Sequence, residues 1–166
     1  MLVLGIDPGT AITGYGLVRE DAAGLALVAC GVIVTPPDRP LPKRLQTIYR
    51  DLADLVRAYQ PEAAAVEELF FSRNARTALS VGHARGVVLL ALADAGLPVH
   101  EYKPLQVKQA ITGYGSADKH QVQEMVRMLL RLDRAPQPDD AADAVAVAVC
   151  HIHSARMLAL VTGALT

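Results

Sequence analysis

The feature that most constrains the fold is a change in hydrophobic periodicity near residue 45. Upstream of it, apolar residues form short runs bounded by turn residues, a pattern typical of β-strands. Downstream, the apolar residues of Leu45–Tyr59 recur every three or four positions, which places them on one face of a helix. The chain therefore begins with strands alone and continues with helices that alternate with strands.

The apolar runs and the turn residues between them predict the order of the elements. We predict strands at Leu2–Asp7, Thr13–Arg19, Leu25–Val34, Ala63–Glu67 and Val99–Tyr102. We predict helices at Leu45–Tyr59, Asn74–Ala95, Lys103–Ile111, Asp118–Leu132 and about Asp139–Val161. Three antiparallel strands followed by β-α-β units indicate an α/β fold, in which helices flank a mixed five-stranded sheet.

The composition fits a single domain over residues 1–166, because 52% of the residues are apolar and no linker divides the chain. The net charge of −1 neither indicates nor excludes nucleic-acid binding, since the acids of a metal site would cancel basic patches in the sum. Cys30 and Cys150 lie in apolar runs, which is typical of buried, reduced thiols.

The sequence predicts a cytoplasmic protein with no membrane segment. The N-terminal stretch MLVLGIDPGT lacks the basic region of a signal peptide. The apolar run from Asp143 to Val161 contains His151, His153 and Arg156, so it is typical of a buried or amphipathic helix rather than of a membrane span.

Acidic residues end two of the predicted strands. Asp7 ends the first strand, and Glu67 and Glu68 end the fourth. Each of them in isolation is more typical of a turn or of a solvent-facing strand end. Because successive strand side chains point to opposite faces, only one of Glu67 and Glu68 can join Asp7, and parity does not decide which.

Three further acids, Asp139, Asp140 and Asp143, open the last predicted helix. Acids in a first turn are ordinary helix-start signals, because they complement the helix dipole. Asp140 and Asp143 nevertheless share one helix face, and Asp143 lies a full turn inside a segment made almost entirely of Ala and Val. A carboxylate buried there would need a partner, and a divalent cation is one such partner.

In the predicted layout, the acids of the two strands and of the last helix converge at one edge of the sheet. Neighbouring carboxylates repel one another unless a cation neutralises them, and hard oxygen ligands favour Mg²⁺ or Mn²⁺. Two such ions about 4 Å apart can activate a water and stabilise the leaving oxygen of a phosphodiester. The acids therefore predict metal-dependent phosphodiester hydrolysis, and no zinc-type spacing of His and Cys competes with this interpretation.

Five stretches of the chain match one known family, in the right order and with suitable spacing. They read LGIDPGTAITGYGLV, AVEELFFSRNARTAL, GHARGVV, EYKPLQVKQAITGYGSADKHQVQEMV and PDDAADAVAVAVCH. Through them the chain resembles the RuvC family of Holliday-junction resolvases along almost its whole length. The resemblance implies the ribonuclease-H-like fold, which agrees with the predicted order of elements.

The resemblance also implies the site residues. The acids of the family fall on Asp7, Glu67, Asp140 and Asp143, so Glu67 rather than Glu68 joins the site. Some members carry another residue at the third acid, and Asp140 is therefore expected to be the most replaceable of the four. Asp139 is left as a helix-start residue.

The activity that the resemblance implies is the resolution of four-way DNA junctions by a homodimer. Two strands would be nicked symmetrically by metal-dependent hydrolysis, which leaves 5′-phosphate and 3′-hydroxyl ends. Mg²⁺ or Mn²⁺ would serve as the cofactor, with two ions in each active site. The implied partners are the junction itself, the second protomer and branch-migration motor proteins.

Basic and aromatic residues predict the DNA-binding surface. Between Ser72 and Arg85 there are arginines and no acid, and the two phenylalanines of the chain come just before. Such a set suits phosphate contact combined with base stacking. The predicted DNA contacts, some of them implied by the resemblance, are Phe70, Phe71, Arg73, Asn74, Arg76, Lys108, Lys119 and His120. Core packing of the phenylalanines and a plain solvated face for the lysines are the open alternatives.

Three other functions compete with junction resolution. A ribonuclease H acting on RNA–DNA hybrids would use the same acids. An actin-like or sugar-kinase ATPase also opens with Asp-x-Gly-Thr, but such proteins need two lobes and 166 residues supply one. A non-catalytic junction-binding module would lack one of the acids, and none is missing here.

Overall fold

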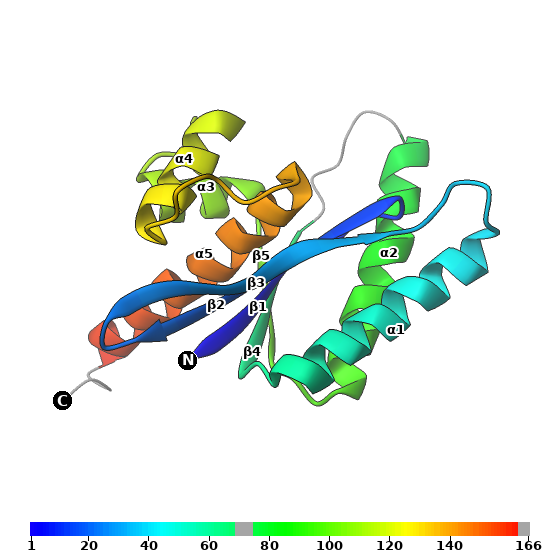
Figure 1. The fold of residues 1–166 in the computed structure, drawn as a ribbon, viewed down its shortest axis with the longest axis horizontal. Helices are drawn as coiled ribbons and strands as arrows, with labels where there is room; N and C mark the ends of the chain where they lie inside the picture. The colour runs from blue at the N-terminus through cyan, green and yellow to red at the C-terminus, as the bar shows by residue number, and fades with distance from the viewer. Residues whose placement is uncertain (69–74, 163–166) are drawn as a thin grey trace.

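A computed structural model describes residues 1–68 and 75–162, without the side chains of residues 75–77 and 162. Its sheet has five strands in the order β3-β2-β1-β4-β5 (Figure 1). The strands are β1 (Leu2–Asp7), β2 (Ile12–Asp21), β3 (Gly24–Val34), β4 (Ala63–Glu67) and β5 (Val99–Tyr102). The first three strands pair antiparallel, whereas β4 runs parallel to both β1 and β5. The predicted α/β fold with a mixed five-stranded sheet is confirmed.

Helices cover both faces of the sheet (Figure 1). Helices α1 (Leu41–Tyr59) and α2 (Ala75–Asp94) pack against one face. Helix α5 (Asp139–Thr162) lies on the other face, and α3 (Pro104–Thr112) and α4 (Lys119–Leu129) pack against it. Each face therefore has its own apolar core.

The side chains of β1 divide between these two cores. Leu2, Leu4 and Ile6 belong to the core under α1 and α2, and Val3 belongs to the core under α5. Alternation along the strand therefore directs Asp7, like Val3, toward the α5 face. The first strand thus fixes the face of the sheet on which an acidic site can form.

Three glycines, Gly5, Gly14 and Gly16, allow α5 to lie directly on the sheet. A Cβ at Gly5 would overlap the main-chain oxygen of Ala144, and a Cβ at Gly14 would overlap that of Asp140. Any other residue at these positions would hold the helix away from the strands. This close approach brings the acidic first turns of α5 to the end of β1.

Most predicted helix boundaries differ from the observed ones by at most one residue, but two are wrong by three residues or more. Helix α1 begins at Leu41 rather than Leu45, because a proline is tolerated in the first turn, where its missing N–H would have no helical partner. Helix α4 ends at Leu129 rather than Leu132, since Leu130 caps it and Arg131 takes a positive φ of 53°. Neither change affects the sheet or the arrangement of the helices.

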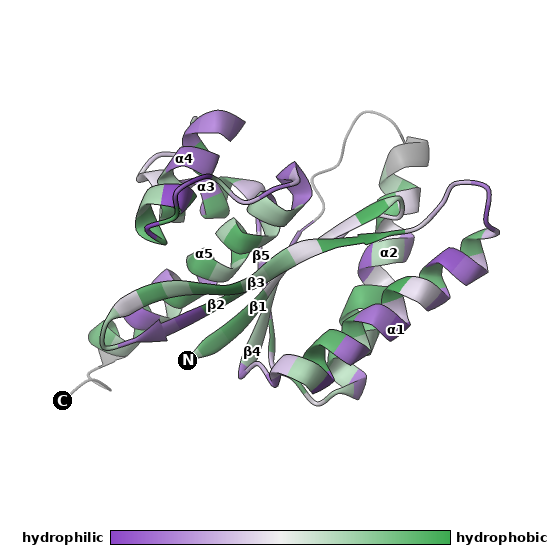
Figure 2. Ribbon diagram, in the orientation of Figure 1, coloured by the Kyte–Doolittle hydropathy of each residue, from purple (hydrophilic) through white to green (hydrophobic). Residues whose placement is uncertain are grey.

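Helix α5 is, within the described chain, the one helix long and apolar enough to span a membrane by length and composition alone. Half of its apolar window is buried inside the protein, where Ala144–Cys150 and Ile152 contact the sheet and its neighbouring helices. Figure 2 shows the hydrophobic colouring of α5 and β1 beside the more hydrophilic α4. Packing against the sheet thus accounts for the apolar character of the buried half of α5.

Candidate active site

Asp7 and Glu67 end two neighbouring parallel strands. The register pairs Ile6 of β1 with Val66 of β4, so the next residue on each strand lies at the same level of the sheet. Both carboxyls point to the α5 face, because Val3 and Ala65, which are an even number of residues away, belong to the core on that face. The backbone register therefore brings Asp7 and Glu67 together.

The carboxyls of Asp7 and Glu67 share a hydrogen bond. Burial, followed by repulsion from Asp143 and Asp140, raises the pKa of Asp7 to about 6. Burial, followed by repulsion from Asp7, raises the pKa of Glu67 to about 8. Without a cation, these raised pKa values favour one proton on the pair near neutral pH.

Asp140 and Asp143 approach this pair from the first two turns of α5. Both contribute to the repulsion that raises the pKa of Asp7, and Asp143 also repels Glu67. Burial raises the pKa of Asp143 itself, and a hydrogen bond from Lys119 opposes that shift. The four predicted acids thus form one electrostatically coupled group, as their convergence in the predicted layout requires.

Lys119, at the start of α4, forms ion pairs beside this group. Its Nζ lies 3.0 Å from Oδ2 of Asp143 and 3.3 Å from Oδ2 of Asp139. Asp139 also accepts a hydrogen bond from Gln123 Nε2 at 3.1 Å, and these hydrogen bonds lower the pKa of Asp139. Although Asp139 lies at the helix start, as the sequence predicts, it also holds Lys119 beside Asp143.

A cavity of about 200 Å³ opens beside the acids. Glu67, Asp143, Lys108 and Lys119 supply its charged wall, and its remaining lining is Pro104, Val107, Val122 and Ala146. The two lysines come from different helices, α3 and α4. The cavity thus offers carboxylate oxygens and ammonium groups to one small anionic group.

Within the described residues, no three Asp, Glu, His or Cys side chains are arranged to ligate an ion in this structure. Asp7 and Glu67 hydrogen bond to each other, and Asp143 is paired with Lys119. The donors themselves are carboxylate oxygens, which suit hard cations such as Mg²⁺ and Mn²⁺. Loss of the shared proton and rotation of Asp143 away from Lys119 would supply three such donors.

The model of the family described as "Crossover junction endodeoxyribonuclease RuvC" matches residues 3–151 of this sequence. The chain belongs to the RuvC family. A RuvC protein of Roseiflexus sp. (strain RS-1) is 60% identical over 155 residues, a match that covers 93% of this chain and 92% of the relative. The fold and the order of the motifs therefore have a common origin with those of RuvC proteins.

Two solved RuvC structures superpose closely on this one. Thermus thermophilus RuvC in complex with a Holliday junction substrate has a TM-score of 0.87 and 41% identity, with 95% of this chain and 96% of that chain covered. A second structure of Thermus thermophilus RuvC has a TM-score of 0.88 and 42% identity over the same shares. The positions of strands and helices around the acids are thus those of a RuvC fold.

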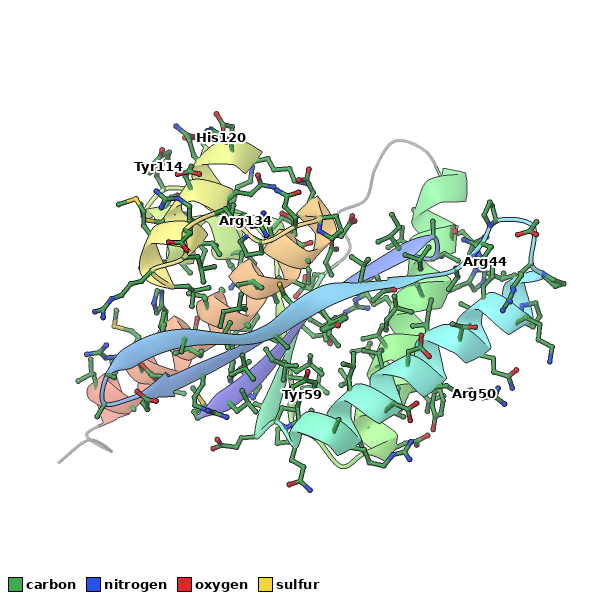
Figure 3. All side chains as sticks on the ribbon, in the orientation of Figure 1. Arg44, Arg50, Tyr59, Tyr114, His120 and Arg134 are labelled. Atoms are coloured by element: carbon green, nitrogen blue, oxygen red, sulfur yellow. The ribbon has the colours of Figure 1, made fainter. Side chains whose placement is uncertain are left out.

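The predicted DNA contacts of this RuvC-family chain are residues beside the cavity, an exposed residue at the start of α4, and residues whose side chains are not described. Lys108 and Lys119 line the cavity, and His120 is exposed at the start of α4, where Figure 3 labels it. Arg76 lies in α2, but its side chain is outside the described residues. The others, Phe70, Phe71, Arg73 and Asn74, also lie outside the described residues. The structure thus places two of the eight predicted contacts beside the acids.

Two contacts near the site were not foreseen in the sequence. Arg85, which counts toward the basic stretch, forms an ion pair with Glu101 of β5 and is therefore occupied within the protein. Tyr102, paired with Glu67 across the sheet, hydrogen bonds through its hydroxyl to Nδ1 of His151 at 2.8 Å. Burial, followed by the neighbouring His100, lowers the pKa of His151 to about 4, so its ring is neutral. No motif signals these pairs, because their members are far apart in the sequence.

Proposed function

We propose that this RuvC-family protein resolves four-way DNA junctions by hydrolysing one phosphodiester bond in each of two strands. The observation that supports it most is the coupled acid group, Asp7, Glu67, Asp140 and Asp143, beside a cavity that also presents two lysines. The chain's similarity to a protein solved with a Holliday junction substrate supports the choice of DNA. Acids alone would equally suit other phosphodiesters.

The four acids would hold Mg²⁺ or Mn²⁺, with two ions in each active site. The donor chemistry fits, since buried carboxylates with raised pKa values are stabilised in their charged form by a cation. When bound, such ions lower the pKa of a water and offset the charge that develops on the phosphate and on the leaving oxygen.

The remaining steps follow from the side chains. Loss of the proton shared by Asp7 and Glu67 leaves both as charged ligands. Lys119 and Lys108 reach the cavity from α4 and α3, where ammonium groups attract a phosphate oxygen. The water oxygen forms a bond to phosphorus while the bond to the 3′ oxygen breaks, so the products carry 5′-phosphate and 3′-hydroxyl ends.

Symmetric nicking requires two active sites, and the exposed face of α2 supports a homodimer. Leu79, His83, Gly86 and Leu90 are exposed and recur at helical spacing along one side of this helix. Leu79 is 64% and Leu90 is 53% exposed, and Gly86 leaves open space where a side chain would stand. The same face of a second copy, related by a twofold axis, would cover these leucines. The twofold symmetry of such a dimer would match that of a four-way junction.

The resemblance to RuvC proteins supports two further parts of the proposal. Branch-migration motor proteins would deliver the junction, and the protein would act in the cytoplasm, where bacterial DNA lies. Both follow from the family rather than from a particular contact in this chain.

Incubation with three labelled substrates in Mg²⁺ or Mn²⁺ tests the activity. A mobile four-way junction, a linear duplex and an RNA–DNA hybrid of the same sequence should be compared. We expect paired nicks in two strands of the junction, with the duplex and the hybrid left intact. Asp7→Asn should abolish nicking but retain junction binding in a gel-shift assay, because it removes a ligand charge without changing the shape of the side chain.

The substrates also separate the competing functions. Cleavage of the hybrid in preference to the junction would indicate a ribonuclease H. Equal cutting of junction and duplex, or full activity of Asp7→Asn, would contradict the proposal. Leu79→Glu with Leu90→Glu tests the homodimer, because sedimentation should then report a monomer and the paired nicks should become unpaired.

A further inference from the structure

A groove of about 460 Å³ lies at the start of α1, apart from the acidic site. Its lining consists of Arg39, Pro40, Lys43, Gln46, Thr47 and Arg50. Three of these side chains carry a positive charge, the amide of Gln46 can donate hydrogen bonds, and none is acidic. A surface of this kind suits an anion with several oxygens.

The charges of the groove are not neutralised within the protein. Among the described residues, no ion pair involves Arg39, Lys43 or Arg50. The ammonium of Lys43 donates a long hydrogen bond to the neutral side-chain oxygen of Gln46 at 3.4 Å. Residues 35–50 contain four basic residues and one acid, Asp38, whereas the whole chain has a net charge of −1. This concentration of positive charge is thus a local feature.

Hydrogen bonds fix the groove to the turn that follows Asp7. Arg44 points inward, with Nε donating to Thr35 Oγ1 at 2.9 Å and Nη2 donating to the main-chain oxygen of Thr10 at 3.0 Å. Thr10 in turn donates through its hydroxyl to the main-chain oxygen of Ser80 in α2. Arg44 is therefore a structural anchor, and its neighbours Lys43 and Arg50 are held at a set position relative to Asp7.

The groove lies near the same edge of the sheet as the acids, although α1 covers the opposite face of the sheet. Thr10 follows Asp7 by three residues, which span about 10 Å at most. In Figure 3, Arg44 lies near the start of α1 and Arg50 lies further along the same helix. DNA that extends from Asp7 to the groove would therefore pass around this edge of the sheet, along the turn that contains Thr10.

We propose that this groove binds the phosphate backbone of a duplex arm of the DNA substrate, next to the arm that is cut. Lys43 and Arg50 are seven residues apart on one face of α1, about 10 Å along the helix axis. Each strand of duplex DNA places a phosphate about every 3.4 Å of its axis, so the basic row can meet two or three phosphates. The inference rests on the proposed function and deepens it by naming a second DNA contact.

The salt dependence of binding tests the proposal. Arg39→Gln, Lys43→Gln and Arg50→Gln should be combined in an Asp7→Asn background, which keeps the junction intact. Because each phosphate contact contributes about 0.9 to the slope of log affinity against log salt concentration, the slope should fall by about 2 to 3. The affinity at low salt should fall at least tenfold, as fluorescence anisotropy with a labelled junction would measure.

A matched control removes the same number of charges elsewhere. Arg19 on β2 and Arg57 near the end of α1 lie away from the groove, and Arg156 lies near the end of α5. Replacing these three by Gln should leave the slope within about half a unit of the parent, because they make no phosphate contact. With Asp7 restored, the groove variant should nick a junction at near the parental rate once protein saturates the DNA.

Each outcome separates this inference from the proposed function. If the parent fails to bind junctions in preference to single strands, the proposed function fails. If the parent binds but the groove variant and the control variant have equal slopes, the groove does not contact DNA. If the groove variant loses its nicking rate even at saturation, Arg39, Lys43 and Arg50 act on the chemistry rather than on binding, which also overturns the inference.

Discussion

The strand-borne and helix-borne acids are held in place in different ways. Asp7 and Glu67 end adjacent strands, so the backbone register alone sets how far apart they lie. Asp140 and Asp143 reach the site only because α5 packs closely on the sheet. The first pair is therefore the fixed part of the site, and the second pair is the part that packing can move.

The strand-borne acids and the helix-borne acids also differ in the groups that they contact. The strand-borne pair shares a proton, whereas Asp143 is paired with the ammonium of Lys119. A cation that enters the site must therefore displace a proton from one half and a lysine from the other. We therefore expect pH to control how Asp7 and Glu67 bind a cation. Packing and charge should control how Asp140 and Asp143 do so.

Removal of a strand-borne charge is expected to have the largest effect. Glu67→Gln should lower the single-turnover nicking rate about 10³-fold or more, which corresponds to about 4 kcal/mol of activation free energy. Glu68→Gln is the matched control, since it removes the same charge one residue beyond the end of β4. A rate assay at saturating protein compares the two, and equal losses would refute the choice of Glu67 over Glu68.

Loss of a helix-borne acid should have a smaller and unequal effect. Asp143→Asn should lower the nicking rate about 10²-fold, or about 2.7 kcal/mol, because Asp143 lines the cavity beside Glu67. Asp140 does not line that cavity, and Asp140→Asn should lower the rate only about tenfold. The same assay measures both, and a larger loss for Asp140→Asn would reverse the order proposed here.

A methyl group between β2 and α5 should move Asp140 and Asp143 without changing any acidic side chain. Gly14→Ala places a Cβ against the main-chain oxygen of Asp140, so the helix must shift. Overpacking of this kind costs about 2 kcal/mol of stability. Urea unfolding measures the loss, and the nicking rate should fall with it. An unchanged unfolding midpoint would show that α5 does not rest on β2.

The strand-borne half should respond to pH. Because burial raises the pKa of Asp7 to about 6 and that of Glu67 to about 8, ionising them costs stability. The contribution of these two groups to the stability of the metal-free protein should be greatest below about pH 4 and decline as pH rises through about 6 and then 8. Mg²⁺ favours the ionised pair, so its apparent affinity should rise by up to about tenfold per pH unit over this range.

Thermal unfolding with EDTA or with Mg²⁺, recorded between pH 5 and pH 9, tests this dependence. Glu67→Gln is the control, because without that titrating group the decline in stability toward pH 8 should flatten. A Mg²⁺ affinity that stays constant across this range would show that Asp7 and Glu67 do not share a proton in the metal-free protein.

The smallest effect is expected at Tyr102. Tyr102→Phe removes the hydrogen bond from its hydroxyl to Nδ1 of His151 and should cost about 1 kcal/mol of stability. The bond ties β5 to α5, so the nicking rate should change by no more than a few-fold. Chemical denaturation measures the loss, and a rate that falls as far as in Asp143→Asn would instead place Tyr102 in the chemistry.

Much of the fold could be read from local patterns. Short apolar runs and helical spacing depend on neighbours within a few residues, so the strands, the helices and their order were predictable. The ends of helices were less predictable, as the start of α1 at Leu41 and the end of α4 at Leu129 show. A boundary depends on a few hydrogen bonds and caps, and several positions satisfy these almost equally well.

The site was predictable only in part. The sequence identified the acids, and the resemblance to the RuvC family chose Glu67, but residue spacing alone favoured structural roles for each acid. The pairing of Lys119 with Asp139, the ion pair of Arg85 with Glu101, and the groove anchored by Arg44 join segments that are distant in the sequence. No local pattern reports such contacts.

The sequence by itself thus determined the strand-and-helix order, the acids available at the ends of β1 and β4, and the family. The tertiary structure decided which acids share a proton, which one pairs with a lysine, and where positive charge is left unpaired. The physical reason is that secondary structure follows from short-range periodicity, whereas pKa values and ion pairs depend on burial and on distances between groups that only packing brings together.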